Sequence, residues 1–529
     1  MNMPAVDNQP KKGKKKRAPT LLLLPVLLLV VLCLLPILYV VLRAQQAGWA
    51  QAVQLIFRER VYELLVNTLK MDFSVTILSV IIGVATAWFI ERTSLPGKKM
   101  WNVLVTLPFA VPSFVSSYSW ISFFPQVEGL SGAVLVLTLS SYPLVHLPVA
   151  AALRGMDPAL EETSRSLGYG RFETFFRVTL PQLRPALLGG AILIALHMLA
   201  EFGALEFLNY DTFTTAIFDQ YNVAFDGASA AMLTSVLLVL CLFILGLELL
   251  LRGNAKYATN TKGSASEPEI ISLGWKTPFI VTGFIILFIF SSGVPLGILM
   301  YWLFTGTSAT FDWAEILQSL YSTLSFGLGG SLLAILFALP LVILAIRYKG
   351  TFSVLADRLP YFIHSLPGLV IGLTLVFFAI NYVHPLYQTI PLLIIGYAML
   401  YLPLAQSSVR AAMEQVPKQM EEVGSSLGKG SGTVFFKVTL PLITPGVGAG
   451  MALVFLEVMK ELTATLLLRP TGVNTLATKI WEHTTSIEYG ASAPYAALLI
   501  LISGLPVYLL TMRSFRSKKK REVNEEITH

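Results

Sequence analysis

Acidic side chains occupy matched positions within two long apolar stretches, where they could interact with a charged solute. Glu201 follows Pro185 by the same number of residues as Glu461 follows Pro445. Charged groups are costly in hydrocarbon and usually face a cavity or a partner. We interpret them either as the lining of a path that tolerates a cation or as partners in interhelical hydrogen bonds or salt bridges, for instance to Lys460. The candidate path residues are Glu201, Glu206, Glu457 and Glu461.

No pattern of side chains in the sequence indicates catalysis or a resident metal. The six histidines have no ligand spacing, and both cysteines, Cys33 and Cys241, lie in apolar stretches. The segment Gly424–Gly430 resembles a phosphate-binding loop, but its spacing is one residue short and Gly430 stands where serine or threonine would bind magnesium. We therefore expect no cofactor on this chain; if ATP drives this protein, ATP and Mg²⁺ must be bound by a partner.

A polar segment occurs twice in the chain, in register and without a gap. Residues 161–185 read EETSRSLGYGRFETFFRVTLPQLRP, and residues 421–445 read EEVGSSLGKGSGTVFFKVTLPLITP. Each copy begins with two glutamates and continues through Ser-Leu-Gly and Phe-Phe to Val-Thr-Leu-Pro. Both copies lie between long apolar stretches, so both must contact something in water. An amphipathic surface loop without a partner is the alternative, which the duplication disfavours.

Each polar segment should begin as a short helix and then turn. A helix that starts near Asp157-Pro158 or Pro417 carries the paired glutamates in its first turn, at the positive end of the helix dipole. Gly168 and Gly428 permit a turn that is closed to other residues. The later prolines mark entry into the next apolar stretch.

The composition is that of an integral membrane protein, with 55% hydrophobic and 13% charged residues. A span needs about 20 apolar residues, and the stretches are too long and too continuous for the strands of a barrel. We predict an all-α polytopic membrane protein with about twelve transmembrane helices. They lie near residues 20–42, 64–90, 101–123, 131–153, 186–208, 228–251, 277–304, 318–346, 360–382, 388–409, 446–468 and 494–512.

The distribution of lysine and arginine over the loops predicts how the spans are oriented. Every second loop is basic, which places these loops and both termini in the cytoplasm, with Arg58, Arg60 and Arg469 as exceptions. This rule explains the net charge of +7 better than nucleic-acid binding does. The predicted division is a basic cytoplasmic tail at 1–19, a six-span domain at 20–252, a cytoplasmic linker at 253–276, a second six-span domain at 277–513 and a cytoplasmic tail at 514–529.

The two halves match beyond the polar segments. Asn67-Thr68-Leu69 and Ser322-Thr323-Leu324 open corresponding spans, and Leu107-Pro108 and Leu366-Pro367 interrupt the spans that follow. Because each half has an even number of spans, both copies point the same way. The sequence therefore predicts two parallel six-helix repeats, related by a pseudo-twofold axis along the membrane normal.

The polar segments resemble the EAA loop of ABC importer permeases, in which Glu-x-x-x-x-x-Gly is followed after nine residues by Val-x-Leu-Pro. The two alanines of that pattern are replaced here by Thr163-Ser164 and Val423-Gly424. In that family the loop forms a coupling helix that docks in a groove on a separate ATPase subunit. The resemblance covers nearly the whole chain and implies two fused domains of the type I importer permease fold. The coupling residues it implies are Glu161, Glu162, Gly168, Leu180, Pro181, Glu421, Glu422, Gly428, Leu440 and Pro441.

The resemblance implies a transport subunit rather than an enzyme, in the plasma membrane of a prokaryote (the inner membrane of a Gram-negative cell). Its partners would be two ABC ATPase subunits, as a homodimer, and an extracytoplasmic substrate-binding protein. The segments 201–217 and 460–478 resemble the ferric-iron branch, whereas the thiamine and polyamine branches share much of the architecture. A secondary transporter or channel driven by an ion gradient is the alternative from another class.

Two loops at 209–227 and 469–492 should face outward and meet the substrate-binding protein. Both carry polar and charged side chains, although surface loops are commonly charged in any protein. The candidate contacts with the substrate-binding protein are Tyr210, Asp211, Asp219, Glu482 and His483.

Overall fold

A computed structural model describes residues 19–156, 159–252, 270–306, 311–348 and 350–504. Within these residues the regular structure is helical, apart from one isolated bridge between Thr93 and Ile271. Helices are the expected result for such apolar stretches, because a helix satisfies its backbone hydrogen bonds within the segment. The described chain is therefore all-α, as the composition predicts.

Within the part of the chain that the structure describes, nine helical runs are long and apolar enough to cross a membrane, and two bent helix pairs can each form one more span. A shorter apolar helix, Tyr489–Gly504, begins near the twelfth predicted position, which continues beyond the described residues. Eleven of the twelve predicted spans are thus matched in place, and the twelfth stays a prediction. The nine runs are Leu22–Ala47, Glu59–Arg92, Gly129–Gly155, Arg171–Ala200, Gly227–Leu247, Gly274–Thr305, Trp313–Arg347, Ile390–Glu414 and Gly432–Lys460.

Proline accompanies both bends. Leu107 and Pro108 begin a 3-10 turn, η1 (Leu107–Ala110), and the first bend follows at Val111-Pro112, whereas Leu366-Pro367 lies at the second bend itself. Residues Lys98–Ala110 and Ser113–Phe123 meet at 88°, and Thr351–Ile363 and Gly368–Tyr382 meet at 108°. Proline lacks the N–H group that an α-helix needs, so a break at these positions is the expected outcome. The helices after the breaks are α5 (Ser113–Phe123) and α18 (Gly368–Tyr382).

Each half has a core of three packed helices. In the first half these are α3 (Glu59–Arg92), α7 (Pro143–Gly155) and α10 (Leu180–Ala200). In the second half they are α16 (Trp313–Arg347), α19 (Ile390–Glu414) and α22 (Leu440–Lys460). The three core helices occupy corresponding positions in the two halves of the sequence, which confirms that the chain contains an internal repeat.

The first span of each half packs against the other half. Helix α1 (Thr20–Ala47) contacts α16, α17 (Thr351–His364) and α18. Helices α14 (Thr277–Phe288) and α15 (Val294–Thr305) contact α4 (Lys98–Thr106) and α5, respectively. Aromatic pairs accompany the exchange: the ring centroids of Tyr39 and Phe377 are 5.3 Å apart, and those of Trp101 and Phe284 are also 5.3 Å apart. Because the first span of each half packs against the other half, the two repeats are held together by these contacts.

The predicted linker is described only from residue 270 onward, since 253–269 lie outside the described residues. Its last part is hydrogen-bonded to the end of α3: Ile271 N–H donates to the Arg92 carbonyl at 2.9 Å, and Ser94 N–H donates to the Ile271 carbonyl at 2.9 Å. The start of the second half is thereby attached to the end of a core helix of the first half.

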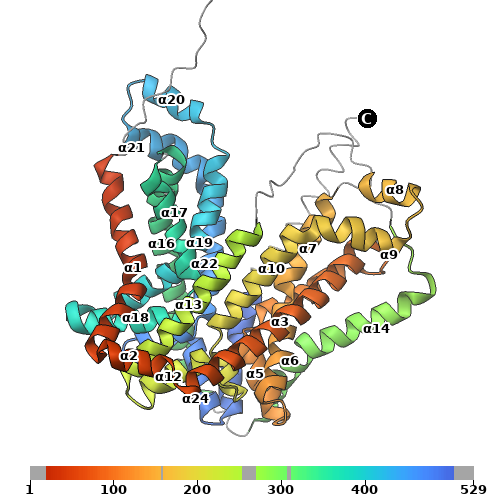
Figure 1. Ribbon diagram of the computed structural model, residues 1–529, viewed down its shortest axis with the longest axis horizontal. Coiled ribbons are helices and arrows are strands. Elements are labelled where there is room, and N and C mark those ends of the chain that lie inside the picture. The colour runs from red at the N-terminus through yellow and green to blue at the C-terminus, as the bar shows by residue number, and fades with distance from the viewer. Residues whose placement is uncertain (1–18, 157–158, 253–269, 307–310, 349, 505–529) are drawn as a thin grey trace, which may run out of the picture.

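The molecule has the shape of two arms that diverge at one end (Figure 1). The short helices α8 (Ala159–Ser166) and α20 (Lys418–Ser426) lie on different arms at that end, and α12 (Phe213–Asn222) and α24 (Leu476–Thr485) lie at the other. Toward the second end the halves pack together, and Phe114 and Val115 of α5 share an apolar core with Leu462 and Met459. The arrangement leaves the two polar loops apart from one another.

Candidate functional site

Both polar segments fold in the same way. Helix α8 leads through Gly168 to α9 (Arg171–Thr174), and a π-helical turn, η2 (Phe175–Thr179), leads into α10. Helix α20 leads through Gly428 to α21 (Ser431–Val434), and the π-helical turn η6 (Phe435–Thr439) leads into α22. The prediction of a short helix followed by a turn is confirmed. The residues after the turn are already helical, whereas the sequence had placed the entry into the span at the later prolines.

The glycines at the turns adopt the left-handed backbone that the motif predicts. The φ angle is +89° at Gly168 and +74° at Gly428. Gly168 N–H donates to the Arg165 carbonyl at 2.9 Å, and Gly428 N–H donates to the Ser425 carbonyl at 3.0 Å, which closes each helix. No atom lies within 4 Å of a Cβ built on either glycine, so the backbone angle alone selects glycine there.

The paired glutamates of each loop have different environments. Glu162 and Glu422 are exposed to solvent, whereas the side chains of Glu161 and Glu421 are 19% and 24% exposed. The Oε1 atom of Glu161 accepts a hydrogen bond from Thr179 Oγ1 at 2.8 Å, and that of Glu421 accepts one from Thr439 at 3.1 Å. Only the second glutamate of each pair is therefore presented outward.

The Leu-Pro residues of the motif do not lie on the loop surface. Leu180 and Pro181 open α10, and Leu440 and Pro441 open α22. A proline within a helical run removes one backbone N–H, and the π-helical turn lies directly before it in both copies. The Leu-Pro residues therefore lie where the loop joins the membrane-spanning helix.

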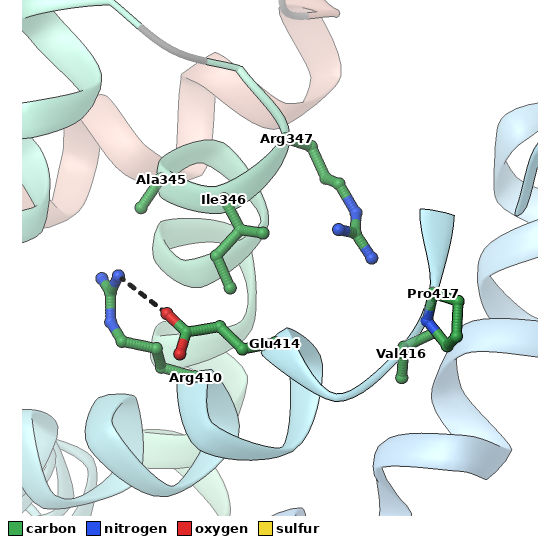
Figure 2. Close-up of a pocket in the computed structure, with 7 residues that line it drawn as sticks. All are labelled: Ala345, Ile346, Arg347, Arg410, Glu414, Val416 and Pro417. Atoms are coloured by element: carbon green, nitrogen blue, oxygen red, sulfur yellow. Dashed lines mark ion pairs between the residues drawn. The ribbon is translucent and has the colours of Figure 1, made fainter. Parts of the chain in front are cut away.

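A pocket of about 460 Å³ lies beside the second polar loop. Figure 2 shows Arg347, Arg410 and Glu414 around it, with the Arg410–Glu414 ion pair at 4.0 Å drawn as a dashed line. The remaining lining residues are Ala345, Ile346, Val416 and Pro417. In the first half the residue matched to Glu414 is Arg154, which forms an ion pair with Glu91 at 2.8 Å, so the two loops have different surroundings.

The matched carboxylates Glu201 and Glu461 lie at helix breaks rather than inside continuous helices. Helix α10 ends at Ala200, directly before Glu201. The Oε1 atom of Glu201 accepts a hydrogen bond from the backbone N–H of Ala204, in the short helix after the break, at 3.1 Å. Its Oε2 atom accepts a hydrogen bond from the Ser113 hydroxyl at 2.8 Å. Ser113 is the first residue of α5. The carboxylate therefore joins the ends of three helices.

Glu461 repeats this arrangement in the second half. It follows the end of α22, and its Oε1 accepts the N–H of Ala464 at 2.9 Å, while Oε2 accepts the hydroxyl of Tyr401. A Cβ at Gly368, the first residue of α18, would lie 2.7 Å from Glu461 Oε1. Of the two interpretations of the sequence, hydrogen bonding between helices is the one that this geometry favours.

The other predicted path residues surround these breaks. Lys460 Nζ lies 3.3 Å from Glu457 Oε1 on the same helix and 4.7 Å from the ring centroid of Phe109 in the other half. Glu206 lies beyond the break, on the short helix α11 (Gly203–Phe207). His197, matched in sequence to Glu457, lies 3.9 Å from Glu201. Among the described residues, no group of three histidine, cysteine or acidic side chains is placed to hold a metal ion.

Helices α12 and α24 lie at the end of the molecule opposite the polar loops (Figure 1). Each begins with a threonine capping box, formed by Thr212 in α12 and by Thr475 in α24. A threonine of the core span also accepts the first backbone N–H of each helix: Thr68 from Phe213 at 3.3 Å and Thr323 from Leu476 at 2.9 Å. The matched Thr-Leu pairs of the sequence thus anchor these two helices.

Most of the predicted outward-facing contacts have partners within the chain. The Asp211 carboxylate lies 2.6 Å from Arg60, which is one of the exceptions to the charge rule, and the Tyr210 hydroxyl donates to the Asn67 carbonyl at 3.0 Å. Burial and the nearby carboxylate of Asp211 raise the pKa of Asp219 above its usual value. The other two contacts are also paired: Glu482 with Lys479 at 3.0 Å and His483 with Glu488 at 2.8 Å.

An aromatic cluster that the sequence analysis did not identify closes the interface between the halves near this end. Trp481 of α24 lies with its ring centroid 5.2 Å from Phe202, 5.0 Å from Phe207 and 6.0 Å from Phe218. The rings of Phe202 and Phe218 are 4.5 Å apart. Trp481 follows Thr475 by the same number of residues as Phe218 follows Thr212. Comparison of the two repeats could therefore have identified Trp481 and Phe218 as matched aromatic residues.

Comparison with known proteins gives the same division into two repeats. The chain matches the family described as binding-protein-dependent transport system inner membrane component over residues 18–253 and again over 330–517. The two matched regions contain both polar loops and both sets of core helices, apart from the first part of α16.

Individual relatives cover either the whole chain or one half of it. The chain is 44% identical over 504 residues to the Fe(3+)-transport system permease protein FbpB 2 of Haemophilus influenzae, which covers 95% of this chain and 100% of that protein. It is 26% identical to the ferric transport system permease protein FbpB of Actinobacillus pleuropneumoniae, over 85% of this chain and 71% of that protein. It is also 30% identical to the sulfate transport system permease protein CysT of Escherichia coli, over 40% of this chain and 84% of that protein.

Proposed function

Because the chain belongs to the family of binding-protein-dependent transport system inner membrane components, we propose that it is the permease through which ferric iron passes from an extracytoplasmic binding protein into the cytoplasm. The chain is a transport subunit of an ABC importer and not itself an enzyme. Energy must therefore come from a partner, and we assign ATP and Mg²⁺ to separate ATPase subunits.

The single observation that carries the coupling role is the pair of exposed glutamates. Glu162 on α8 and Glu422 on α20 are presented to solvent at the same end of the molecule, each on a short helix closed by a left-handed glycine. Two equal docking elements fit two equal partners, so each loop would seat one subunit of an ATPase homodimer. This end of the molecule would then be cytoplasmic, as would both termini.

Ferric iron is favoured by the proteins that match nearly the full chain. The relatives from Haemophilus influenzae and Actinobacillus pleuropneumoniae are both named for the transport of ferric iron, and the former covers 95% of this chain. The sulfate relative corresponds to one half only. The inner membrane of the cell is the corresponding location for a multi-pass permease of this family.

The divergent arms suggest how docking would move the chain. If bound ATP draws two ATPase subunits together, α8 and α20 approach one another and the arms close at the cytoplasmic end. The halves would then part near Trp481 at the opposite end, and the cargo would enter from the binding protein. ATP can drive this shift only by binding the closed arrangement more tightly than the open one. Hydrolysis would restore the arrangement with separated loops.

Glu201 and Glu461 would serve this motion as joints between helix ends. Each carboxylate lies at the end of a core helix and accepts the backbone N–H of the short helix that follows it; Glu201 also accepts Ser113 at the start of α5, and Glu461 also accepts Tyr401 of α19. A buried carboxylate that accepts a backbone N–H fixes that N–H in place, so each joint would move as a unit. The cargo would pass between the two joints without removing either carboxylate from its donors.

Transport in a reconstituted system tests the proposed function. Proteoliposomes that contain this chain and its ATPase should accumulate radioactive ferric iron only when ATP and the loaded binding protein are both present. Ferric iron uptake driven by an ion gradient, without ATPase, would indicate a secondary transporter instead. ATP-dependent uptake of thiamine or a polyamine, without uptake of iron, would support an ABC importer but reject ferric iron as its cargo.

A further inference from the structure

An arginine ends a core helix in each half and faces the neighbouring polar loop. Arg92 is the last residue of α3 and is 2% exposed, and Arg347 is the last residue of α16 with a side chain that is 12% exposed. Arg92 Nη2 lies 3.6 Å from Glu161 Oε1, and Arg347 Nη2 lies 2.8 Å from Glu421 Oε1. The first glutamate of each loop is thus the counter-ion of a core helix.

A threonine completes each of these contacts. Thr179 and Thr439 end the two π-helical turns, and each donates its hydroxyl to the same Oε1 atom that faces the arginine. We name these two sets of residues the loop clamps: Arg92, Glu161 and Thr179 in the first half, and Arg347, Glu421 and Thr439 in the second. Each loop clamp joins three segments of one half, namely the loop helix, the core helix before it and the turn that leads into the span after it.

Burial makes the loop clamps resistant to separation. Within the described part of the chain, the guanidinium nitrogens of Arg92 are buried and make no hydrogen bond, which leaves Glu161 to neutralise its charge. Removing the partner of a buried charge is strongly unfavourable, because the charge remains without water or a counter-ion. A force on α8 should therefore carry the end of α3 with it. In the second half the contact is a direct hydrogen bond, from Arg347 Nη2 to Glu421 Oε1 at 2.8 Å, so a force on α20 should carry the end of α16 through that bond.

We propose that Arg92 and Arg347 are positioning residues that transmit the movement of the docked loops into the core helices. The inference rests on the proposed docking of α8 and α20 on ATPase subunits and assigns separate tasks to the two glutamates of each loop. The exposed second glutamate meets the ATPase, while the first glutamate ties the loop to the transport path. The same geometry in two copies that differ in much of their surrounding sequence supports a shared task.

The test replaces both arginines in the complete importer complex. Arg92→Gln with Arg347→Gln should leave the ATPase bound to the permease and should leave the apparent affinity for the binding protein unchanged. Ferric iron taken up per ATP hydrolysed should fall at least about tenfold, since each 1.4 kcal/mol of lost coupling corresponds to a factor of ten. Arg92→Lys with Arg347→Lys keeps the charge and should restore part of the coupling. Arg154→Gln is the control, because Arg154 is 39% exposed and its ion pair joins α7 to Glu91 of α3 rather than a core helix to a polar loop.

The remaining outcomes distinguish the loop clamps from the docking itself. Unchanged uptake per ATP in the double glutamine variant overturns the proposal, even if docking is intact. If that variant does not fold, Thr179→Val with Thr439→Val decides, because it keeps the buried volume and both charges: a reduced ratio of uptake to hydrolysis supports the loop clamps, and an unchanged ratio rejects them. Failure of the unmodified permease to bind the ATPase would instead refute the proposed function.

Discussion

Replacing Gly168 and Gly428 by valine should uncouple ATP hydrolysis from transport. Both glycines have positive φ angles, and nothing lies within 4 Å of a Cβ at either position, so the substitution adds backbone strain without a steric clash. A residue with a side chain in such a conformation costs about 1–3 kcal/mol. At 1.4 kcal/mol for each factor of ten, this strain disfavours the native turn by about 5-fold to 150-fold in each loop.

The chain offers a control two residues further along each loop. Gly170 and Gly430 are also exposed and also have open space around a built Cβ, but neither has a positive φ angle. Gly170→Val with Gly430→Val therefore adds the same side chains to the same surfaces without the strain. The assay is iron uptake per ATP hydrolysed in proteoliposomes, with ATPase binding measured in parallel. Equal uptake per ATP in both double variants would refute the role assigned to the left-handed turn.

Three further predictions concern the loops, the joints and the aromatic cluster. Glu162→Ala with Glu422→Ala should reduce co-purification of the ATPase by about tenfold or more, because truncating one member of an interfacial charge pair commonly costs ~2 kcal/mol or more; undiminished co-purification would remove these residues from the docking surface. Glu201→Gln with Glu461→Gln should impair uptake and lower the melting temperature while ATPase binding is retained, because charge-assisted hydrogen bonds become neutral ones; wild-type uptake and stability would argue against the joints. Trp481→Ala should let iron enter vesicles without ATP, because the truncation leaves a void between the halves and such truncations destabilise a packed core by roughly 3–5 kcal/mol. Vesicles that exclude iron as well as the wild type does would show that the aromatic cluster does not close the transport path.

Much of the architecture could be predicted because its signals are local. Apolar stretches give the spans, and prolines mark the two breaks: Leu366-Pro367 lies at the second break, and Leu107-Pro108 begins the turn that precedes the first break at Val111-Pro112. The left-handed turns at Gly168 and Gly428 follow from the motif, and both carry positive φ angles. In each case a few adjacent residues determine the backbone, so no knowledge of distant contacts is needed.

The remaining features depend on contacts between residues that are far apart in the sequence. The exchange of first spans has no local signal, because α1 is apolar around most of its surface and could pack against either half. The role of Glu201 depends on Ser113, which lies in a different helix. Arg92 follows Thr68 by the same number of residues as Arg347 follows Thr323, but this match indicates only that each arginine lies near the end of a corresponding span. Their burial against the loops required the packed structure.

If two like-facing docking helices couple ATP hydrolysis to transport through this chain, uptake must depend on both of them. The most direct test measures ferric iron uptake in proteoliposomes that contain the permease, the ATPase and the loaded binding protein, with the Glu162→Ala and Glu422→Ala substitutions introduced singly and together. We expect uptake in wild type to require ATP, to fall with either substitution and to be lost with both. Uptake that persists in the double variant, or that proceeds without ATPase, would contradict this expectation.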